Sequence, residues 1–120
     1  MTNRTNILIV DDNANLCKSL SMILRLKGHA VTVALGGPQA IEHVRKKSFD
    51  LILLDIKMVP MDGVETFCEI KRIRPEAVVM MMTAYAVEDQ VQEALRQGAN
   101  GVLYKPVDID EMIALADRIG

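Results

Sequence analysis

Five polar residues of this chain have the side chains that phosphoryl transfer requires: Asp11, Asp12, Asp55, Thr83 and Lys105. Three carboxylates suit a hard cation such as Mg²⁺, which takes oxygen ligands. Thr83 can donate a hydrogen bond to a phosphoryl oxygen, and Lys105 offers a mobile positive charge for phosphate. An aspartate can also act as a covalent acceptor. Because phosphoryl transfer depends mainly on positioning and on charge neutralisation, this set of residues indicates that chemistry.

The polar residues stand at the ends of short apolar runs that have the composition of strands buried on both faces. Strands are expected at 6–10, 31–34, 51–54, 77–82 and 102–104, and helices at 13–27, around 40–44, at 64–73, 87–97 and 109–119. Strands that alternate with helices form a parallel sheet, in which all carboxyl ends share one edge. Ligands bind at that edge in open α/β folds, so the polar residues should converge there.

The three carboxylates should not lie together without compensation. Two like charges about 4 Å apart repel by about 4 kcal/mol at an effective dielectric constant of about 20. A bound Mg²⁺ and the Lys105 ammonium would relieve this repulsion, so the lysine and the metal belong to the same hypothesis as the three acids.

Length and composition favour one α/β domain over residues 1–120. Five strand–helix units favour a single doubly wound (βα)5 sheet, because a TIM barrel needs eight such units. The net charge of −2, without a basic stripe, argues against direct nucleic-acid binding. The sequence shows neither a signal peptide nor an apolar run of membrane-spanning length. With only two cysteines, a disulfide framework is not expected either, so we expect a soluble, cytoplasmic protein.

These residues and their neighbours resemble the response-regulator receiver domain of two-component signalling, over essentially the whole chain. The matching segments are Asp11-Asp12, Leu53-Leu54-Asp55-Ile56-Lys57-Met58, Met61-Asp62-Gly63, Thr83-Ala84-Tyr85, Gly98-Ala99 and Lys105-Pro106. An acidic pair alone would be a weak signal, whereas polar elements in this order, each ending its own apolar run, are a specific one. The resemblance implies a flavodoxin-like fold with the parallel strand order 2-1-3-4-5.

The resemblance implies that Asp55 is the phosphoacceptor and that Mg²⁺ is the cofactor. Asp12 and Asp55 would bind the ion directly, and the backbone carbonyl of Lys57 would be a third protein ligand. Asp11 would act through a water molecule. The donor would be a phosphohistidine on a sensor histidine kinase or a small acyl phosphate. Such a phosphoprotein is not a conventional enzyme, although it catalyses its own phosphorylation and dephosphorylation.

The resemblance also implies a switch that starts at the phosphoryl group. Thr83 and Lys105 would contact that group, and the Thr83 hydroxyl would pull the loop that begins at Ala84. The Lys105–Pro106 peptide bond is expected to be cis. The stretch from Thr83 to Tyr85 resembles receivers of transcriptional regulators, so transcription regulation is the expected context.

The expected output surface consists of the fourth helix, the fifth strand and the fifth helix. It would bind a downstream effector domain or protein, or a second copy of the chain in a weak homodimer. Its outward polar residues would be Asp89, Gln92, Glu93, Arg96, Asp110, Asp117 and Arg118. The fourth helix should turn a thin apolar face inward, made of Val87, Val91, Ala94 and Leu95.

Two positions depart from the receiver pattern. Receivers usually carry proline four residues after the acceptor, whereas this chain has Val59 there, followed by Pro60. The shape of the loop near the metal therefore stays open. Val102 occupies a place that is often Phe or Tyr, so the aromatic switch of the family should be absent or weaker. Tyr104 is aimed differently by strand alternation and is not assigned that role.

Three other interpretations remain beside this one. An aspartate-dependent phosphatase of the haloacid dehalogenase type carries a second Asp two residues after its nucleophile, and Lys57 at that place argues against it. A degenerate receiver would act only as a protein-interaction module, but it would be expected to lack an acidic residue, the Thr or the Lys. On its own, Asp12 or Asn13 could also simply cap the first helix.

Overall fold

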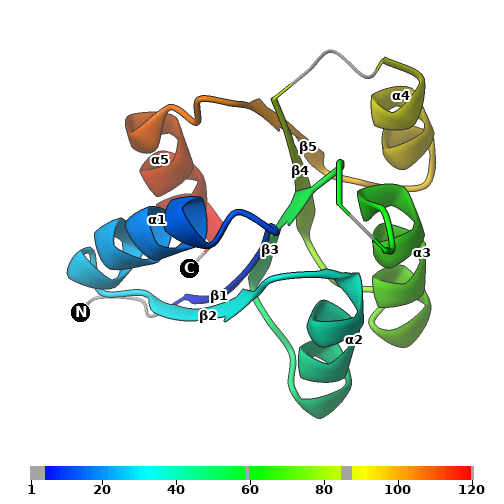
Figure 1. Ribbon diagram of the computed structural model, residues 1–120. Helices are drawn as coiled ribbons and strands as arrows, with labels where there is room; N and C mark the ends of the chain where they lie inside the picture. Colours follow the sequence, from blue (N-terminus) through cyan, green and yellow to red (C-terminus); the bar gives the residue numbers. More distant parts are fainter. Residues whose placement is uncertain (1–4, 59, 85–87, 120) are drawn as a thin grey trace.

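The computed structural model describes residues 5–58, 60–84 and 88–119 (Figure 1). Strands and helices alternate in the order β1 (Asn6–Val10), α1 (Ala14–Leu26), β2 (Ala30–Ala34), α2 (Gly37–Lys46), β3 (Leu51–Asp55), α3 (Gly63–Ile73), β4 (Val79–Thr83), α4 (Glu88–Arg96), β5 (Gly101–Tyr104) and α5 (Ile109–Ile119). All strand pairs are parallel, and the strand order is β2-β1-β3-β4-β5, which confirms the expected topology.

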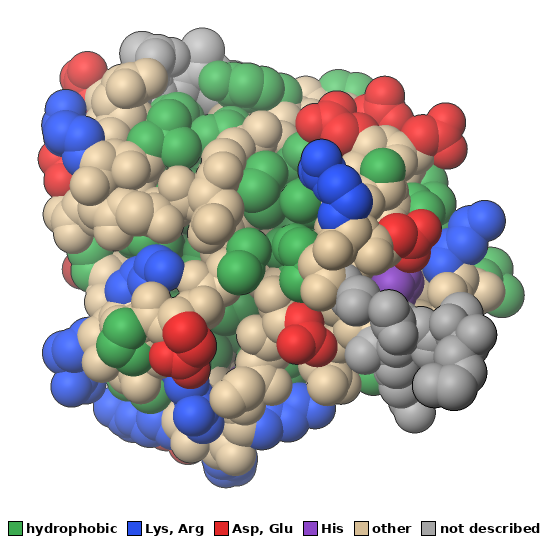
Figure 2. Space-filling model, turned by 180° about the vertical axis from the view of Figure 1, so that it is seen from behind, with side chains coloured by type: hydrophobic (Ala, Val, Ile, Leu, Met, Phe, Trp, Pro, Cys, Tyr) green, Lys and Arg blue, Asp and Glu red, His purple; other side chains and the backbone are tan. Residues whose placement is uncertain are grey.

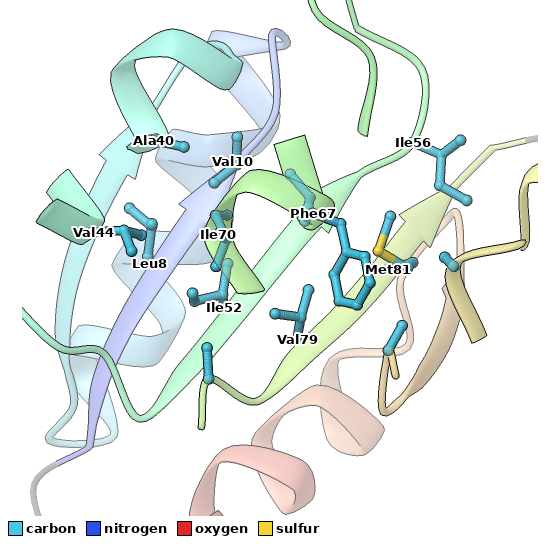
Figure 3. Close-up of a cluster of buried hydrophobic side chains, with 14 of the residues drawn as sticks. Leu8, Val10, Ala40, Val44, Ile52, Ile56, Phe67, Ile70, Val79 and Met81 are labelled. Atoms are coloured by element: carbon cyan, nitrogen blue, oxygen red, sulfur yellow. The ribbon is translucent and has the colours of Figure 1, made fainter. Parts of the chain in front are cut away.

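The sheet separates two hydrophobic clusters because successive side chains of a strand point to opposite faces. Helices α1 and α5 cover one face, and α2, α3 and α4 cover the other (Figure 1). Leu8 and Val10 of β1 belong to the cluster under α2 and α3, while Ile7 and Ile9 belong to the one under α1 and α5. In the cluster under α2 and α3, Phe67 of α3 lies beside Val79 and Met81 (Figure 3). Apolar residues are thus needed on both faces of every central strand, as the continuous runs predict.

Polar caps and glycines set where the helices begin and end. The Asn13 side chain accepts a hydrogen bond from the Leu16 N–H at 3.1 Å, so Asn13 rather than Asp12 caps α1. Asp62 caps α3 in the same way. Gly28 and Gly98 follow α1 and α4 with φ of 95° and 105°, a left-handed conformation that strongly favours glycine. The caps at Asn13 and Asp62 thus fix where α1 and α3 begin, after the loops that follow Asp12 and Asp55.

Helix α4 differs from the expectation in its inward face. Val91 and Ala94 are buried, but Leu95 is 37% exposed, so its assignment to the inward face is wrong. One residue further along a helix is turned by about 100°, so Leu95 lies beside the covered stripe rather than in it. Val87 lies outside the described residues. The apolar face of α4 in the described part of the chain is therefore narrower than the sequence indicates.

Strands β3 and β4 end one residue later than expected, at Asp55 and Thr83, and β4 begins at Val79 instead of residue 77. The acceptor candidate and the threonine thus belong to the sheet itself. Within the described parts of the chain, no helix is both long enough and apolar enough to cross a membrane.

Candidate functional site

The carboxyl ends of four strands bring the predicted site residues to one edge of the sheet. Asp55 and Thr83 are the last residues of β3 and β4, while Asp11 and Lys105 directly follow β1 and β5. Strand pairing aligns them, because Val10 pairs with Leu54, Asp55 with Met82 and Thr83 with Tyr104. In addition, the Lys105 N–H donates to the Thr83 carbonyl at 2.7 Å. Registered strands therefore fix the spacing of the site.

The three carboxylates form a compact cluster. One oxygen from each of Asp11, Asp12 and Asp55 lies within 4.8 Å of the others. Asp11 is fully buried and Asp55 is 4% exposed, while Asp12 is exposed. Lys105 Nζ lies 2.6 Å from Asp11 Oδ2 and 3.5 Å from Asp55 Oδ1. The lysine is thus held between the two buried carboxylates and closest to Asp11.

Backbone groups hold the acids in place. The Asn13 N–H donates to Asp11 Oδ1 at 2.9 Å, so both oxygens of Asp11 have partners. The Cys17 thiol donates to the Asp11 carbonyl at 3.3 Å, and burial, with the Asp11 charge, raises the pKa of that thiol to about 11. Cys17 is therefore a protonated core thiol under the site.

Burial and like charge shape the titration of the site. Burial, followed by the negative charge of Asp11, raises the pKa of Asp55 to about 6, although Lys105 and a backbone hydrogen bond from Lys57 act in the opposite direction. Burial lowers the pKa of Lys105, but its hydrogen bond to Asp11 and the charges of Asp55 and Asp11 outweigh this and raise it overall. The site therefore carries more negative charge than its one lysine compensates.

The loop after β3 packs directly on the backbone of Asp55. The Gly63 N–H donates to the Ile56 carbonyl at 2.8 Å, and a Cβ at residue 63 would lie 2.2 Å from the Asp55 carbonyl oxygen. Only glycine allows so close an approach. This contact explains the Asp62-Gly63 pair of the sequence pattern.

The β5 side of the site confirms one expectation from the sequence. The Lys105–Pro106 peptide bond is cis, as expected. Tyr104 is 55% exposed and Val102 is half-buried against the cluster under α2 and α3. Ala84, Lys105 and Pro106 line a separate pocket of about 480 Å³ beside α1.

The donor set of the acidic cluster fits a hard divalent cation. Three carboxylate oxygens converge, two of the acids are buried, and one ammonium group lies beside them. Mg²⁺ prefers such oxygen ligands and usually keeps several waters, for which the exposed Asp12 leaves room. The residues therefore suit the cofactor that the sequence implies.

A family comparison agrees with the fold. The model of the response regulator receiver domain matches residues 7–117. The chain belongs to this family. Its general function is therefore that of a receiver domain in a two-component response regulator.

Curated relatives of this receiver domain include regulators that are much longer than the chain. It is 47% identical over 109 residues to the transcriptional regulatory protein ZraR of Klebsiella oxytoca, covering 91% of this chain and 25% of that protein. It is 40% identical over 108 residues to a response regulator receiver protein of Anaeromyxobacter sp., covering 90% of this chain and 45% of that one. The chain thus spans about a quarter of the length of its ZraR relatives.

Solved receiver structures share the fold over nearly the whole chain. A CheY-like receiver domain from Methanospirillum hungatei superposes with a TM-score of 0.92 at 28% identity, covering 98% of this chain and 94% of that one. A Burkholderia pseudomallei response regulator, crystallised with a phosphorylated aspartic acid, a calcium ion and citrate, gives a TM-score of 0.86 at 25% identity, covering 93% of this chain and 66% of that one.

The sequence pattern did not single out one residue that the fold brings to the site. Gln90, in the first turn of α4, lines a pocket with Asp12, Lys57 and three other residues. Nothing in its local sequence marks it, because only the packing of α4 beside the loop after β3 creates this neighbourhood.

Proposed function

We propose that residues 1–120 form one receiver domain whose Asp55 accepts a phosphoryl group from a sensor histidine kinase or a small acyl phosphate, and that this switches a protein-binding surface. The observation that carries the proposal is the buried Asp55 carboxylate, 3.5 Å from Lys105 Nζ and clustered with Asp11 and Asp12. The phosphorylated aspartic acid and calcium ion of the related Burkholderia protein support the same assignment.

In the proposed reaction an Asp55 carboxylate oxygen forms a bond to phosphorus, and the bond from phosphorus to the donor's leaving atom breaks. With a pKa of about 6, Asp55 is mostly ionised at pH 7 and ready to attack. Lys105 moves from Asp11 toward a phosphoryl oxygen, and the Thr83 hydroxyl donates to another. Mg²⁺, held by Asp12, Asp55 and the Lys57 carbonyl with Asp11 acting through water, would supply the remaining charge neutralisation.

Incubation with acetyl phosphate and Mg²⁺, followed by intact-mass measurement, tests this function. A gain of one phosphoryl group supports the receiver. Turnover of many phosphoesters without a lasting mass change would support an aspartate-dependent phosphatase instead. Absence of both labelling and turnover would support a domain that acts only through protein binding.

Magnesium should stabilise the protein because it relieves repulsion among Asp11, Asp12 and Asp55. At about 10 mM Mg²⁺ and a Kd of about 1 mM, linkage gives a gain of roughly 1.4 kcal/mol. Asp12→Ala should shrink this gain in thermal or urea unfolding. Glu76→Ala, which removes an exposed carboxylate far from the cluster, should keep it. Equal unfolding of the wild type with and without Mg²⁺ would contradict the metal site.

The proposed output surface consists of α4, β5 and α5. Exposed polar residues of both signs lie on its helices, namely Asp89, Gln92, Arg96, Asp110 and Arg118, beside the half-buried Glu93. Figure 2, the view from behind, shows hydrophobic side chains exposed among scattered acidic and basic side chains. Mixed charges suit a two-fold contact between copies. We therefore propose weak dimerisation on activation, or binding of an effector domain, on this surface.

Asp117 does not belong to that surface, although the sequence assigns it there. Its Oδ1 lies 3.1 Å from Nε2 of the buried His29, so it faces the end of α1.

Amide exchange with and without a beryllofluoride phosphoryl mimic should show changed protection in α4 and β5. The Thr83 hydroxyl starts the shift, and α4 buries only Val91 and Ala94 among its described side chains, so it is easily displaced. With valine at position 102, the loop after Thr83 and α4 should carry most of the change. Changes confined to α1 and α2 would contradict the assigned surface.

A further inference from the structure

A pocket of about 230 Å³ lies beside the acidic cluster. Its lining residues come from the loop after β1, the loop between β3 and α3, and the first turn of α4. They are Asp12, Ile56, Lys57, Met58, Asp62 and Gln90. Ile56 and Met58 are buried and form its apolar part. Asp12 belongs both to this pocket and to the carboxylate cluster, so the pocket adjoins the cluster that contains Asp55.

Most polar groups of the pocket already have a task. Asp62 Oδ1 accepts the Glu65 N–H at 2.9 Å as the cap of α3. Asp12 belongs to the proposed metal ligands, and the exposed Lys57 side chain is a cation that cannot accept a hydrogen bond. Within the described residues, the half-buried Gln90 is the neutral lining side chain with both an acceptor and donors to offer.

A neutral acceptor suits a water molecule beside an aspartyl phosphate. The phosphoryl oxygens are negative, so a further carboxylate would add repulsion, whereas an amide oxygen can orient a water without adding charge. Glutamine has this role toward the attacking water in other phosphoryl-transfer proteins.

We infer that Gln90 is a positioning residue that orients the water which hydrolyses the aspartyl phosphate on Asp55, an inference that rests on the proposed function. The water oxygen forms a bond to phosphorus and the bond from phosphorus to the Asp55 oxygen breaks. Asp55 keeps the electron pair as a carboxylate, and both protons of the water leave with inorganic phosphate as H2PO4⁻. Gln90 is part of α4, the helix that phosphorylation is proposed to displace. The lifetime of the phosphoryl group is therefore linked to the position of α4.

The test measures phosphoryl loss from protein labelled with acetyl phosphate and Mg²⁺, after the donor has been removed, by intact mass over time. Gln90→Leu, which keeps the side-chain size and removes the amide, should slow the loss about fivefold, the effect of one typical hydrogen bond. Gln90→Glu keeps an acceptor of the same length but adds the repulsion of a carboxylate, so its rate of loss should lie between those of the leucine variant and the wild type. Gln39→Leu, an exposed first-turn position of α2, is the matched control and should leave the rate unchanged.

Two further readouts separate this role from a structural one. The rate of labelling and the stabilisation by Mg²⁺ should be the same in Gln90→Leu as in wild type. Equal phosphoryl loss from both proteins would overturn the inference, as would a slower loss accompanied by weaker Mg²⁺ stabilisation. A wild-type chain that takes up no phosphoryl group would instead overturn the proposed function itself, and the inference with it.

Discussion

Asp55→Asn should abolish labelling by acyl phosphates and raise the free energy of unfolding of the metal-free protein at pH 7. The change is nearly isosteric and removes the nucleophilic carboxylate. It also removes a buried charge beside Asp11. The gain in stability should be on the order of 3 kcal/mol, because the pKa of Asp55 is raised from 3.8 to about 6 and one unit of pKa shift corresponds to about 1.4 kcal/mol.

The pH dependence of this effect has a definite sign. The pKa of Asp55 is raised from 3.8 to about 6 in the folded protein, so between these values the folded state binds more protons than the unfolded state. Ionisation of Asp55 therefore lowers stability as the pH rises from about 4 to about 6, with little further change above. The stability difference between Asp55→Asn and wild type should grow over that window in urea unfolding.

Glu76→Gln is the control, because it removes an exposed carboxylate outside the site. This variant should be labelled like wild type, and its stability difference from wild type should not grow between about pH 4 and pH 6. Labelling of Asp55→Asn at the wild-type rate would exclude Asp55 as the acceptor, and a loss of stability at pH 7 would contradict the electrostatic account of the cluster.

Lys105→Ala should have the opposite effect on stability. Lys105 Nζ lies 2.6 Å from Oδ2 of Asp11, which is fully buried, and its removal leaves two buried carboxylates without their cation. Loss of one partner of a buried ion pair typically costs about 3–5 kcal/mol. We expect a loss of about 3 kcal/mol at pH 7 in the absence of metal, because the lysine side chain is partly exposed. The loss should be smaller below about pH 6, where Asp55 takes up a proton.

A double variant keeps this prediction testable if the single one folds poorly. Asp11→Asn combined with Lys105→Ala removes both charges of the close pair and should recover a large part of the lost stability. Lys18→Ala, at an exposed position of α1, should leave unfolding nearly unchanged. If Lys105→Ala unfolds like wild type at pH 7, the Lys105–Asp11 pair does not stabilise the protein.

The strand ends were predictable because each apolar run stops at a polar residue. Parallel topology then requires that Asp11, Asp55, Thr83 and Lys105 meet at one edge, and pairing of β1, β3, β4 and β5 places them there. The caps were less certain, because Asp12 and Asn13 have equal capping chemistry. Only the observed hydrogen bond from Leu16 identifies Asn13 as the cap.

Other features depend on packing that the sequence does not encode locally. Helical spacing does not show how wide a stripe of α4 its neighbours cover. It therefore predicts that Leu95 faces inward, although Leu95 is exposed. The position of Lys105, whose Nζ lies closer to Asp11 than to Asp55, is likewise set by the folded structure. The neighbourhood of Gln90 likewise arises only when α4 packs beside the loop after β3.

Mapping the phosphorylated residue tests the central claim most directly. Protein labelled with acetyl phosphate and Mg²⁺ is reduced with borohydride, which converts a phosphorylated aspartate into homoserine, and its peptides are sequenced by mass spectrometry. The account predicts that residue 55 alone is converted, and that Asp55→Asn yields no converted peptide. Conversion at Asp11, Asp12 or Asp62 in the wild type, with Asp55 unchanged, would contradict it.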